Sequence, residues 1–348
     1  MVKRVLAGTL TLIVLAFVVI VISVLRFDVP REELVGKYAG GASQFATLPS
    51  GASVHFRDEG NADGPALVLV HGSNASLHTW EPWVAELGGT YRIVTMDLPG
   101  HGLTGRVPGD DYSREGMAAS VHELTEALGL TRFAIGGNSM GGGVSALYAL
   151  EHPDRVTALI LVNSSGVPVV REETDPPLAF RLARMPVLSK VMRYVLPRSV
   201  VEEGVRKVFV DQSKVTGEMV ARYFDLTLHE GNRDATRMRF ATYSARDEVA
   251  FSERLGGIEM PTLIIWGDKD LLIPVAAADT FKDRIPHAEL VIYENVGHVP
   301  MEEVPAESAG AVAAFLGAAL ARPAPAPVAA AGEPEGAEPE GAEAEGVE

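Results

Sequence analysis

The sequence predicts an α/β fold, with a mostly parallel β-sheet flanked by helices and interrupted by one helical insertion. Short apolar runs, typical of strands buried on both faces, alternate with stretches of helical spacing. This alternation stops between residues 168 and 253, where several prolines divide the helical spacing, and it resumes at Pro261. Because a connecting helix returns the chain to the same edge of the sheet, strands separated by helices pair in parallel.

The bulk composition limits the class of protein and its partners. A chain of 348 residues can hold one large α/β domain with an insertion, or two smaller domains. Its formal net charge of −16 argues against nucleic acid as a partner, although seven glutamates lie in the last 16 residues. The chain has no cysteine, which excludes disulfides, thiolate catalysis and cysteine-based metal sites.

The N-terminal residues predict a membrane anchor. Residues 5–25 carry no charge over 21 positions, which is enough for a helix to cross a hydrocarbon core of about 30 Å. A secretory signal peptide is the alternative, because Lys3 and Arg4 precede the run. The run is long for a signal peptide, however, and no small-x-small cleavage site follows before Arg26. We therefore expect an uncleaved single-pass anchor over residues 1–26.

The charges on the two sides of the apolar run indicate its orientation. Lys3, Arg4 and the amino terminus favour a cytoplasmic N-terminus, whereas Arg26, Arg31 and Lys37 weaken the asymmetry. We expect the large domain on the outer, periplasmic or extracytoplasmic, side of the membrane. Residues 27–42 are expected to form a juxtamembrane linker between the anchor and this domain.

Residues 43–167 are predicted to form the first part of the sheet domain. Residues 43–48 and 53–58 alternate apolar and polar side chains across a Pro-Ser-Gly turn, which indicates a hairpin. Apolar runs predict strands at 66–70, 92–96, 132–135 and 158–162, and helical spacing predicts helices at 76–87, 113–128 and 143–151.

The rest of the chain comprises the insertion, the second part of the domain and a tail. Residues 168–253 predict a helical lid that folds over the sheet. Residues 254–321 complete the domain, with strands at 262–266 and 289–293 and helices at 277–284 and 305–320. Beyond Arg322 the chain contains only Ala, Pro, Gly and Glu apart from two valines, so we expect residues 322–348 to be disordered.

A glycine-rich turn at residues 137–142 (Gly-Asn-Ser-Met-Gly-Gly) joins a predicted strand to a predicted helix. Gly-x-Ser-x-Gly at such a bend is the pattern of a nucleophile elbow, which exposes a serine hydroxyl above the sheet. The turn forces Ser139 toward an unfavourable backbone conformation, and Gly137 and Gly141 permit contacts where a Cβ would clash. A structural turn with an incidental serine is the alternative, because the motif alone is weakly specific.

Three further motifs follow predicted strands, at the sheet edge where open α/β sheets bind their ligands. They occupy residues 71–74 (His-Gly-Ser-Asn), 267–270 (Gly-Asp-Lys-Asp) and 297–300 (Gly-His-Val-Pro). A serine nucleophile needs a base to accept its proton, and the base needs an orienting carboxylate. The chain order Ser139, Asp270, His298 matches the Ser-Asp-His order of such sites, so we predict that these three residues are catalytic.

The sequence leaves an alternative for the base and for the acid. His71 is the second candidate for the base, but at a strand end its ring is expected to bond neighbouring loops. Asp268 is the second candidate for the acid, and its alternative role is to cap a turn.

The oxyanion hole is expected to consist of backbone N–H groups. Met140 follows the nucleophile and Ser73 lies in the His-Gly loop, and these are the positions that supply the two donors. Asn74 is the alternative for the second donor. Asp97, in Asp-Leu-Pro-Gly-His-Gly at residues 97–102, is expected to be structural.

Taken in order, these motifs resemble the α/β-hydrolase fold superfamily, in the branch with serine esterases, lipases and C–C bond hydrolases. The resemblance covers residues 43–320 and rests on the five motifs quoted above. It implies an α/β-hydrolase fold, and residues 168–253 fall where that family usually carries a helical lid. Ser139 stands where haloalkane dehalogenases and epoxide hydrolases carry aspartate, so those two chemistries are not expected.

We therefore expect a membrane-anchored serine hydrolase that cleaves carboxylic esters of a small to medium hydrophobic molecule through an acyl-enzyme on Ser139. No metal or organic cofactor is expected. The expected partners are the small-molecule ester and, through residues 5–25, the membrane. One alternative is a C–C bond hydrolase of the meta-cleavage-product type, whose elbow is similar but whose His-Gly loop is richer in glycine. The other is a catalytically silent, membrane-tethered interaction protein on the same fold.

Overall fold

The computed structural model describes residues 22–169, 194–242 and 244–321, together with residues 8, 9, 11, 12, 14, 15 and 19. The remaining residues of the apolar run at 5–25, residues 170–193 of the expected lid and the expected tail at 322–348 lie outside this part of the chain. Among the helices in the described part, none combines the length and the apolar character needed to span a membrane.

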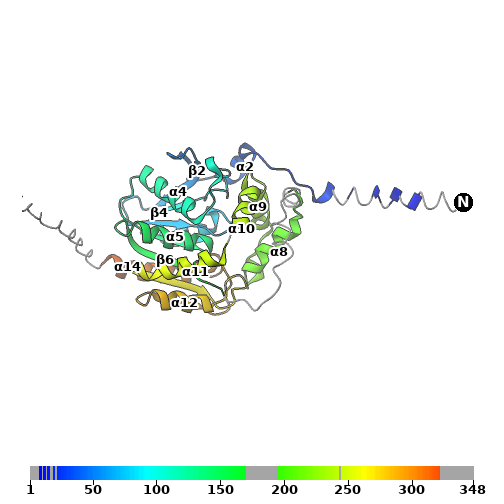
Figure 1. Cartoon of the computed structure of the whole chain (residues 1–348). Coiled ribbons are helices and arrows are strands. Elements are labelled where there is room, and N and C mark those ends of the chain that lie inside the picture. Colours follow the sequence, from blue (N-terminus) through cyan, green and yellow to red (C-terminus); the bar gives the residue numbers. More distant parts are fainter. Residues whose placement is uncertain are drawn as a thin grey trace, which may run out of the picture.

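Eight strands form one sheet, in the order β1-β2-β4-β3-β5-β6-β7-β8 (Figure 1). The first two pair antiparallel with their neighbours and the other six pair in parallel, so the predicted fold class is confirmed. Their bounds are Ser43–Thr47 (β1), Ser53–Gly60 (β2), Ala66–Val70 (β3), Arg92–Met96 (β4), Phe133–Asn138 (β5), Val156–Val162 (β6), Thr262–Gly267 (β7) and Glu289–Tyr293 (β8). Strands β3, β4 and β8 begin and end at the predicted residues, because each is a short, mostly apolar run between turn residues.

Helices cover both faces of the sheet. One face carries α3 (Glu81–Leu87) and α14 (Pro305–Leu320), and the other carries α4 (Arg114–Ala127), α5 (Met140–Glu151) and α12 (Ala276–Arg284). Alternate side chains of each central strand therefore enter different cores. Leu67 and Leu69 of β3 pack with the first pair of helices, whereas Val68 and Val70 pack with the second group.

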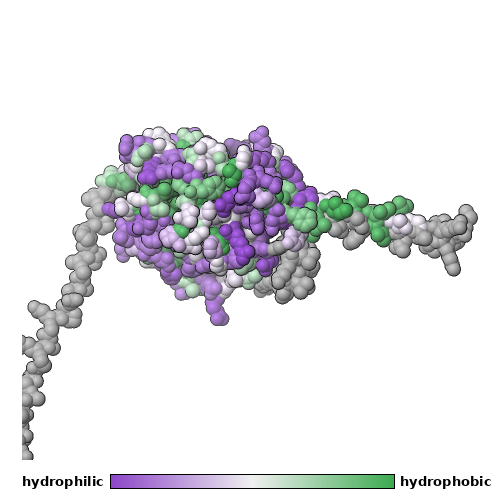
Figure 2. Space-filling model, turned by 90° about the horizontal axis from the view of Figure 1, so that it is seen from above, coloured by the Kyte–Doolittle hydropathy of each residue, from purple (hydrophilic) through white to green (hydrophobic). Residues whose placement is uncertain are grey.

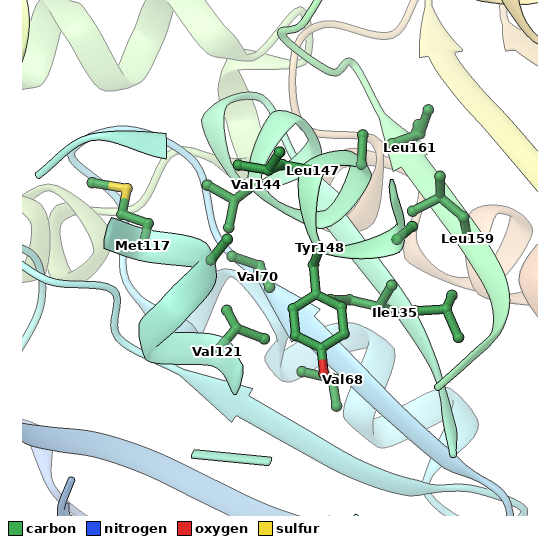
Figure 3. Close-up of a cluster of buried hydrophobic side chains, with 14 of the residues drawn as sticks. Val68, Val70, Met117, Val121, Ile135, Val144, Leu147, Tyr148, Leu159 and Leu161 are labelled. Carbon is green, nitrogen blue, oxygen red and sulfur yellow. The ribbon is translucent and has the colours of Figure 1, made fainter. Parts of the chain in front are cut away.

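The core between α4, α5 and the sheet fixes the position of α5. Figure 3 shows Val144 and Leu147 of α5 pointing toward the side chains of the central strands, with Met117 of α4 beside them. Leu147 and Val144 are fully buried, and each such side chain contributes about 1.5–3 kcal/mol through removal of apolar surface from water. The N-terminus of α5 is thereby held rigidly against the end of the sheet.

Four α-helices lie between β6 and β7 in the described residues of the region expected to be a helical lid. They are α8 (Arg198–Val208), α9 (Gly217–Thr227), α10 (Asn232–Thr242) and α11 (Ala245–Arg254). Side chains cap two of them, because Thr216 accepts a hydrogen bond from Met219 N and Ser244 accepts one from Asp247 N. Figure 1 shows α8, α9 and α10 gathered at one end of the sheet.

The segment expected to be a juxtamembrane linker contains a helix, α2 (Arg31–Tyr38). Its buried side chains Leu34 and Tyr38 are one helical turn apart and pack with Leu103 and with Leu226 of α9. The residues before it also bond to the insertion, since Val29 N donates to Leu228 O at 2.8 Å. Three apolar residues in eight, two of them buried, were too weak a pattern to predict this helix, which tertiary packing stabilises.

Candidate active site

Ser139 occupies a strained turn between β5 and α5. Its φ and ψ are 54° and −122°, a conformation that costs a non-glycine residue about 1–3 kcal/mol. The turn is held in place because Ser139 N donates to Val162 O at 3.0 Å. A Cβ on Gly137 would overlap the carbonyl of Gly141, and a Cβ on Gly141 would overlap the carbonyl of Val70. Only glycine therefore fits on either side of the serine.

His298 and Asp270 meet in the loops after β8 and β7. His298 Nδ1 donates to Asp270 Oδ2 at 2.6 Å, and both side chains are buried. Asn163 Nδ2 donates to the same oxygen at 2.7 Å. The other oxygen, Oδ1, accepts from Leu272 N at 2.7 Å and from Ile273 N at 3.0 Å. Four donors on one carboxylate fix its orientation.

The second candidate for the acid takes no part in this contact. Asp268 forms an ion pair with Lys269 at 2.9 Å, and this hydrogen bond lowers the pKa of the carboxyl. The side chain of Lys269 is largely exposed. Among the described residues, His298 has Asp270 as its carboxylate partner, and the catalytic role of Asp270 stays a prediction.

The loop after β3 lies directly against the serine turn. A Cβ on Gly72 would stand 3.1 Å from Ser139 Cβ and 2.9 Å from Asn138 Oδ1. His71 in the same loop accepts from Leu98 N through Nε2 at 3.0 Å and donates through Nδ1 to Gly72 O at 2.7 Å. Both ring nitrogens of His71 are thus occupied, and burial lowers its pKa. The ring bonds neighbouring loops, as the sequence predicted.

Asp97 is also structural. It accepts hydrogen bonds from Leu77 N at 2.7 Å, Leu103 N at 2.8 Å and His55 Nδ1 at 2.7 Å. Burial alone would raise the pKa of Asp97, but the facing His55 ring lowers it well below its usual range. This carboxylate organises the loop after β4 rather than the candidate site.

Ser139, Met140, Ser73 and His298 line one large cavity beneath the insertion. Met140 is the first residue of α5, so its N–H belongs to the helix turn whose donors lack intrahelical partners. Ser73 lies on the opposite side, in the loop after β3. Asn74, the alternative donor, bonds to the insertion, since its Oδ1 accepts from Thr236 Oγ1 at 2.9 Å.

Three residues that the sequence analysis did not select hold the histidine loop. Asn138 Nδ2 donates to His298 O at 3.0 Å, and Asn163 supports Asp270 as described above. Glu303 is buried and accepts from Gly297 N at 2.8 Å. Asn138 ends β5 and Asn163 follows β6, so their position at the carboxyl edge of the sheet was a usable signal. No pattern marked Glu303.

Glu302 lies on the short helix α13 (Pro300–Glu303), beside the histidine loop. Its environment leads us to expect that the stability of the protein depends on pH. Burial raises the pKa of Glu302 from 4.5 to about 7, although Thr79 Oγ1 donates to Oε1 at 2.5 Å. The folded protein then binds this proton more tightly than the unfolded chain does. The contribution of Glu302 to the free energy of unfolding should therefore fall by about 1–3 kcal/mol as pH rises from about 4.5 to about 7.

Urea unfolding at pH 5 and pH 8 measures this effect as the difference between Glu302→Gln and the wild type, because the variant should lose only the contribution of Glu302. Glu307→Gln, on the exposed face of α14, is the matched control and should follow the wild type. An unchanged difference between pH 5 and pH 8 in Glu302→Gln would show that another group causes it.

Within the described part of the chain, no group of three or more His, Asp or Glu side chains is arranged to hold a metal ion. The chemistry available at the site is that of Ser139, the His298–Asp270 pair and the backbone donors of two loops. These groups can support transfer of an acyl group to a hydroxyl.

Comparison with known proteins adds to this geometry. The model of a family described as alpha/beta hydrolase fold matches residues 65–196 and 221–305. The chain is 30% identical to Lipase 1 of Psychrobacter immobilis over 267 residues, which are 74% of this chain and 78% of that protein. It is 28% identical to the monoacylglycerol lipase ABHD6 of Homo sapiens over 67% of this chain and 70% of that one. A crystal structure of a membrane phospholipase A, a bacterial virulence factor, superposes with a TM-score of 0.67 at 26% identity, covering 92% of this chain and 100% of that chain.

Proposed function

Because the chain belongs to the α/β-hydrolase fold family and is a lipase- and esterase-like hydrolase, we propose that it cleaves carboxylic esters through an acyl-enzyme on Ser139. The observation that carries this proposal is the 2.6 Å hydrogen bond between His298 Nδ1 and Asp270, in a cavity that Ser139 also lines. The strained backbone at Ser139 supports it, because such strain is typical of a residue placed for function.

In the proposed reaction, Ser139 Oγ attacks the ester carbonyl while His298 Nε2 takes its proton. Asp270 keeps the proton on Nδ1, so that Nε2 is free to accept, and stabilises the imidazolium that forms. The backbone N–H groups of Met140 and Ser73 stabilise the oxyanion. His298 then protonates the leaving alcohol, and a water molecule repeats these steps on the acyl-enzyme to release the acid.

The proposed substrate is an ester with a small to medium hydrophobic part. Apolar side chains of the insertion line the cavity, among them Leu196, Val200, Val201, Val205 and Phe240. Burial of an acyl chain against such side chains gives about 25 cal/mol per Å² of apolar surface removed from water. The names of the similar proteins, a lipase, a monoacylglycerol lipase and a membrane phospholipase A, favour lipid esters.

We further propose that residues 5–25 anchor the protein in a membrane, with the N-terminus inside and the hydrolase domain outside. Within this run, Leu12, Val19 and Ile22 are 69%, 64% and 65% exposed, and Figure 2 shows the described apolar residues projecting from the body. Large apolar side chains that face water in this way need another phase or a partner to cover them. The length of the run fits a bilayer core.

One experiment tests both proposals. Cells that produce the full chain are separated into membrane and soluble fractions, the membranes are washed with alkaline carbonate, and hydrolysis of p-nitrophenyl esters from acetate to laurate is measured. Activity should stay in the washed membranes, and its optimum chain length should reflect the size of the cavity. Release by carbonate would contradict the anchor.

The same assay separates the alternative functions. If the protein hydrolysed none of the esters but a fluorophosphonate still labelled Ser139, a narrower chemistry such as C–C bond hydrolysis would be indicated. If the protein neither hydrolysed an ester nor was labelled, a catalytically silent interaction protein would be favoured. Either result would overturn the proposed ester hydrolysis.

A further inference from the structure

Arg239, on α10 of the insertion, is a half-buried cation at the candidate active site, and its Nε is fully buried. Its guanidinium Nη2 donates to Ser73 Oγ, and Nη1 lies 2.9 Å from Met140 Sδ. Ser73 and Met140 are the two residues whose backbone donors flank the expected position of the oxyanion. Arg239 also lines the cavity that Ser139 and His298 line, so a bound substrate lies beside it.

The charge of Arg239 has no counter-charge in the described part of the chain. Both of its acceptors are neutral, and its Nε is buried without a hydrogen-bond partner. The other basic residues lining the cavity each have a carboxylate partner, in the pairs Arg114–Glu248, Arg233–Asp28, Lys207–Glu203 and Arg254–Glu151. Among the described residues that line the cavity, Arg239 is therefore the basic residue without a carboxylate partner.

The surroundings of Arg239 keep it charged but do not neutralise it. Burial lowers its pKa to about 10, which still leaves the guanidinium protonated at neutral pH. Arg239 contributes to lowering the pKa values of His71 and His101, although burial is the larger cause for both rings. The Phe240 ring, whose centroid lies 4.8 Å from the guanidinium carbon, offers a cation–π contact but no negative charge. A charge withdrawn from water without a counter-charge is costly, and such charges in proteins are ordinarily paired.

We propose that Arg239 binds an acidic group of the substrate, so that the preferred ester carries a carboxylate or a phosphate a few bonds from its scissile carbonyl. A guanidinium has five N–H donors in a planar fork that matches carboxylate and phosphate oxygens. The short separation follows from the contacts of Arg239 with residues on both sides of the expected oxyanion site. This inference rests on the proposed ester hydrolysis and specifies its substrate class.

Two matched pairs of esters test the inference and distinguish the two sources of acid. The first pair is mono-p-nitrophenyl adipate and its methyl ester, which differ by a carboxylate on the acyl side. The second is 1-oleoylglycerol 3-phosphate and 1-oleoylglycerol, which differ by a phosphate on the alcohol side. Measurements of kcat and KM use the full chain in detergent, as wild type, Arg239→Gln, Arg239→Lys and Arg237→Gln.

The wild type should prefer the acidic member of at least one pair. Arg239→Gln should lower kcat/KM for that acidic ester about 10- to 100-fold, mainly through KM, because one or two charge-assisted hydrogen bonds are lost. The neutral member should lose much less, and Arg239→Lys should retain part of the preference. Arg237 lies on the same helix, pairs with Asp234 at 3.4 Å and is absent from the cavity lining, so Arg237→Gln should keep the wild-type preference.

Equal losses for both members in Arg239→Gln would overturn the inference, because they would indicate a role in oxyanion stabilisation or in folding. A wild type without preference for either acid would overturn it as well, and this result needs no variant to fold. In both cases Ser139-dependent turnover would leave the proposed ester hydrolysis intact. Failure to hydrolyse any of the four esters would overturn both proposals.

Discussion

Replacement of Ser139 by alanine is expected to lower kcat on carboxylic esters by about 10⁴–10⁶-fold, as removal of the nucleophile does in subtilisin. The cavity and the backbone donors remain in the variant, so KM should change little. The His298→Ala variant should lose a similar factor. The double variant should lose hardly more than either single one, because serine and histidine act in one step and their effects are not additive.

The measurement is steady-state hydrolysis of the best p-nitrophenyl ester, with the active sites counted by a fluorophosphonate. Ser165→Ala is a matched control, because Ser165 lines the same cavity and its N donates to Ser139 O at 2.9 Å. That backbone hydrogen bond survives the substitution, so the control should keep nearly full activity. If Ser139→Ala retained activity while Ser165→Ala lost it, the nucleophile would be misassigned.

Much of the fold could be predicted because its signals are local. Each central strand is a short apolar run with turn residues at both ends, and burial on both faces demands this pattern. The start of α5 was predicted three residues too late, since Gly141, Gly142 and Gly143 disfavour a helix in isolation. The helix nevertheless begins at Met140. Position 141 has to be glycine because its Cα approaches the carbonyl of Val70 more closely than a Cβ allows.

The candidate site was predictable to a similar degree and for a related reason. Ser139, Asp270 and His298 each follow a recognisable strand within a glycine-containing motif, so their meeting at one sheet edge could be expected. Asn163 and Arg239 lie in no such motif. The role of Arg239 depends on how α10 folds over the sheet, which is a long-range contact that local spacing does not encode.

The substitution Asp270→Asn is expected to lower kcat by about 10⁴-fold, as the corresponding change does in trypsin. An asparagine side chain offers one acceptor oxygen where the carboxylate offers two. Leu272 N and Ile273 N face Oδ1 and cannot act as acceptors, so the amide oxygen must occupy that position. The NH₂ group then faces His298, whose Nδ1 has to accept instead of donate. The proton moves to Nε2, and the ring can no longer take the proton of Ser139.

Asp268→Asn is the matched comparison, because Asp268 is the neighbouring carboxylate and its partner is the largely exposed Lys269. Asp268 pairs with Lys269 and makes no contact with His298, whose carboxylate partner is Asp270, so kcat should stay near the wild-type value. The measurement is kcat against pH for both variants, with folding checked by thermal melting. A large loss of kcat in Asp268→Asn, with Asp270→Asn nearly active, would reverse the two assignments. Loss in Asp270→Asn alone would identify the carboxylate that sets the tautomer of His298.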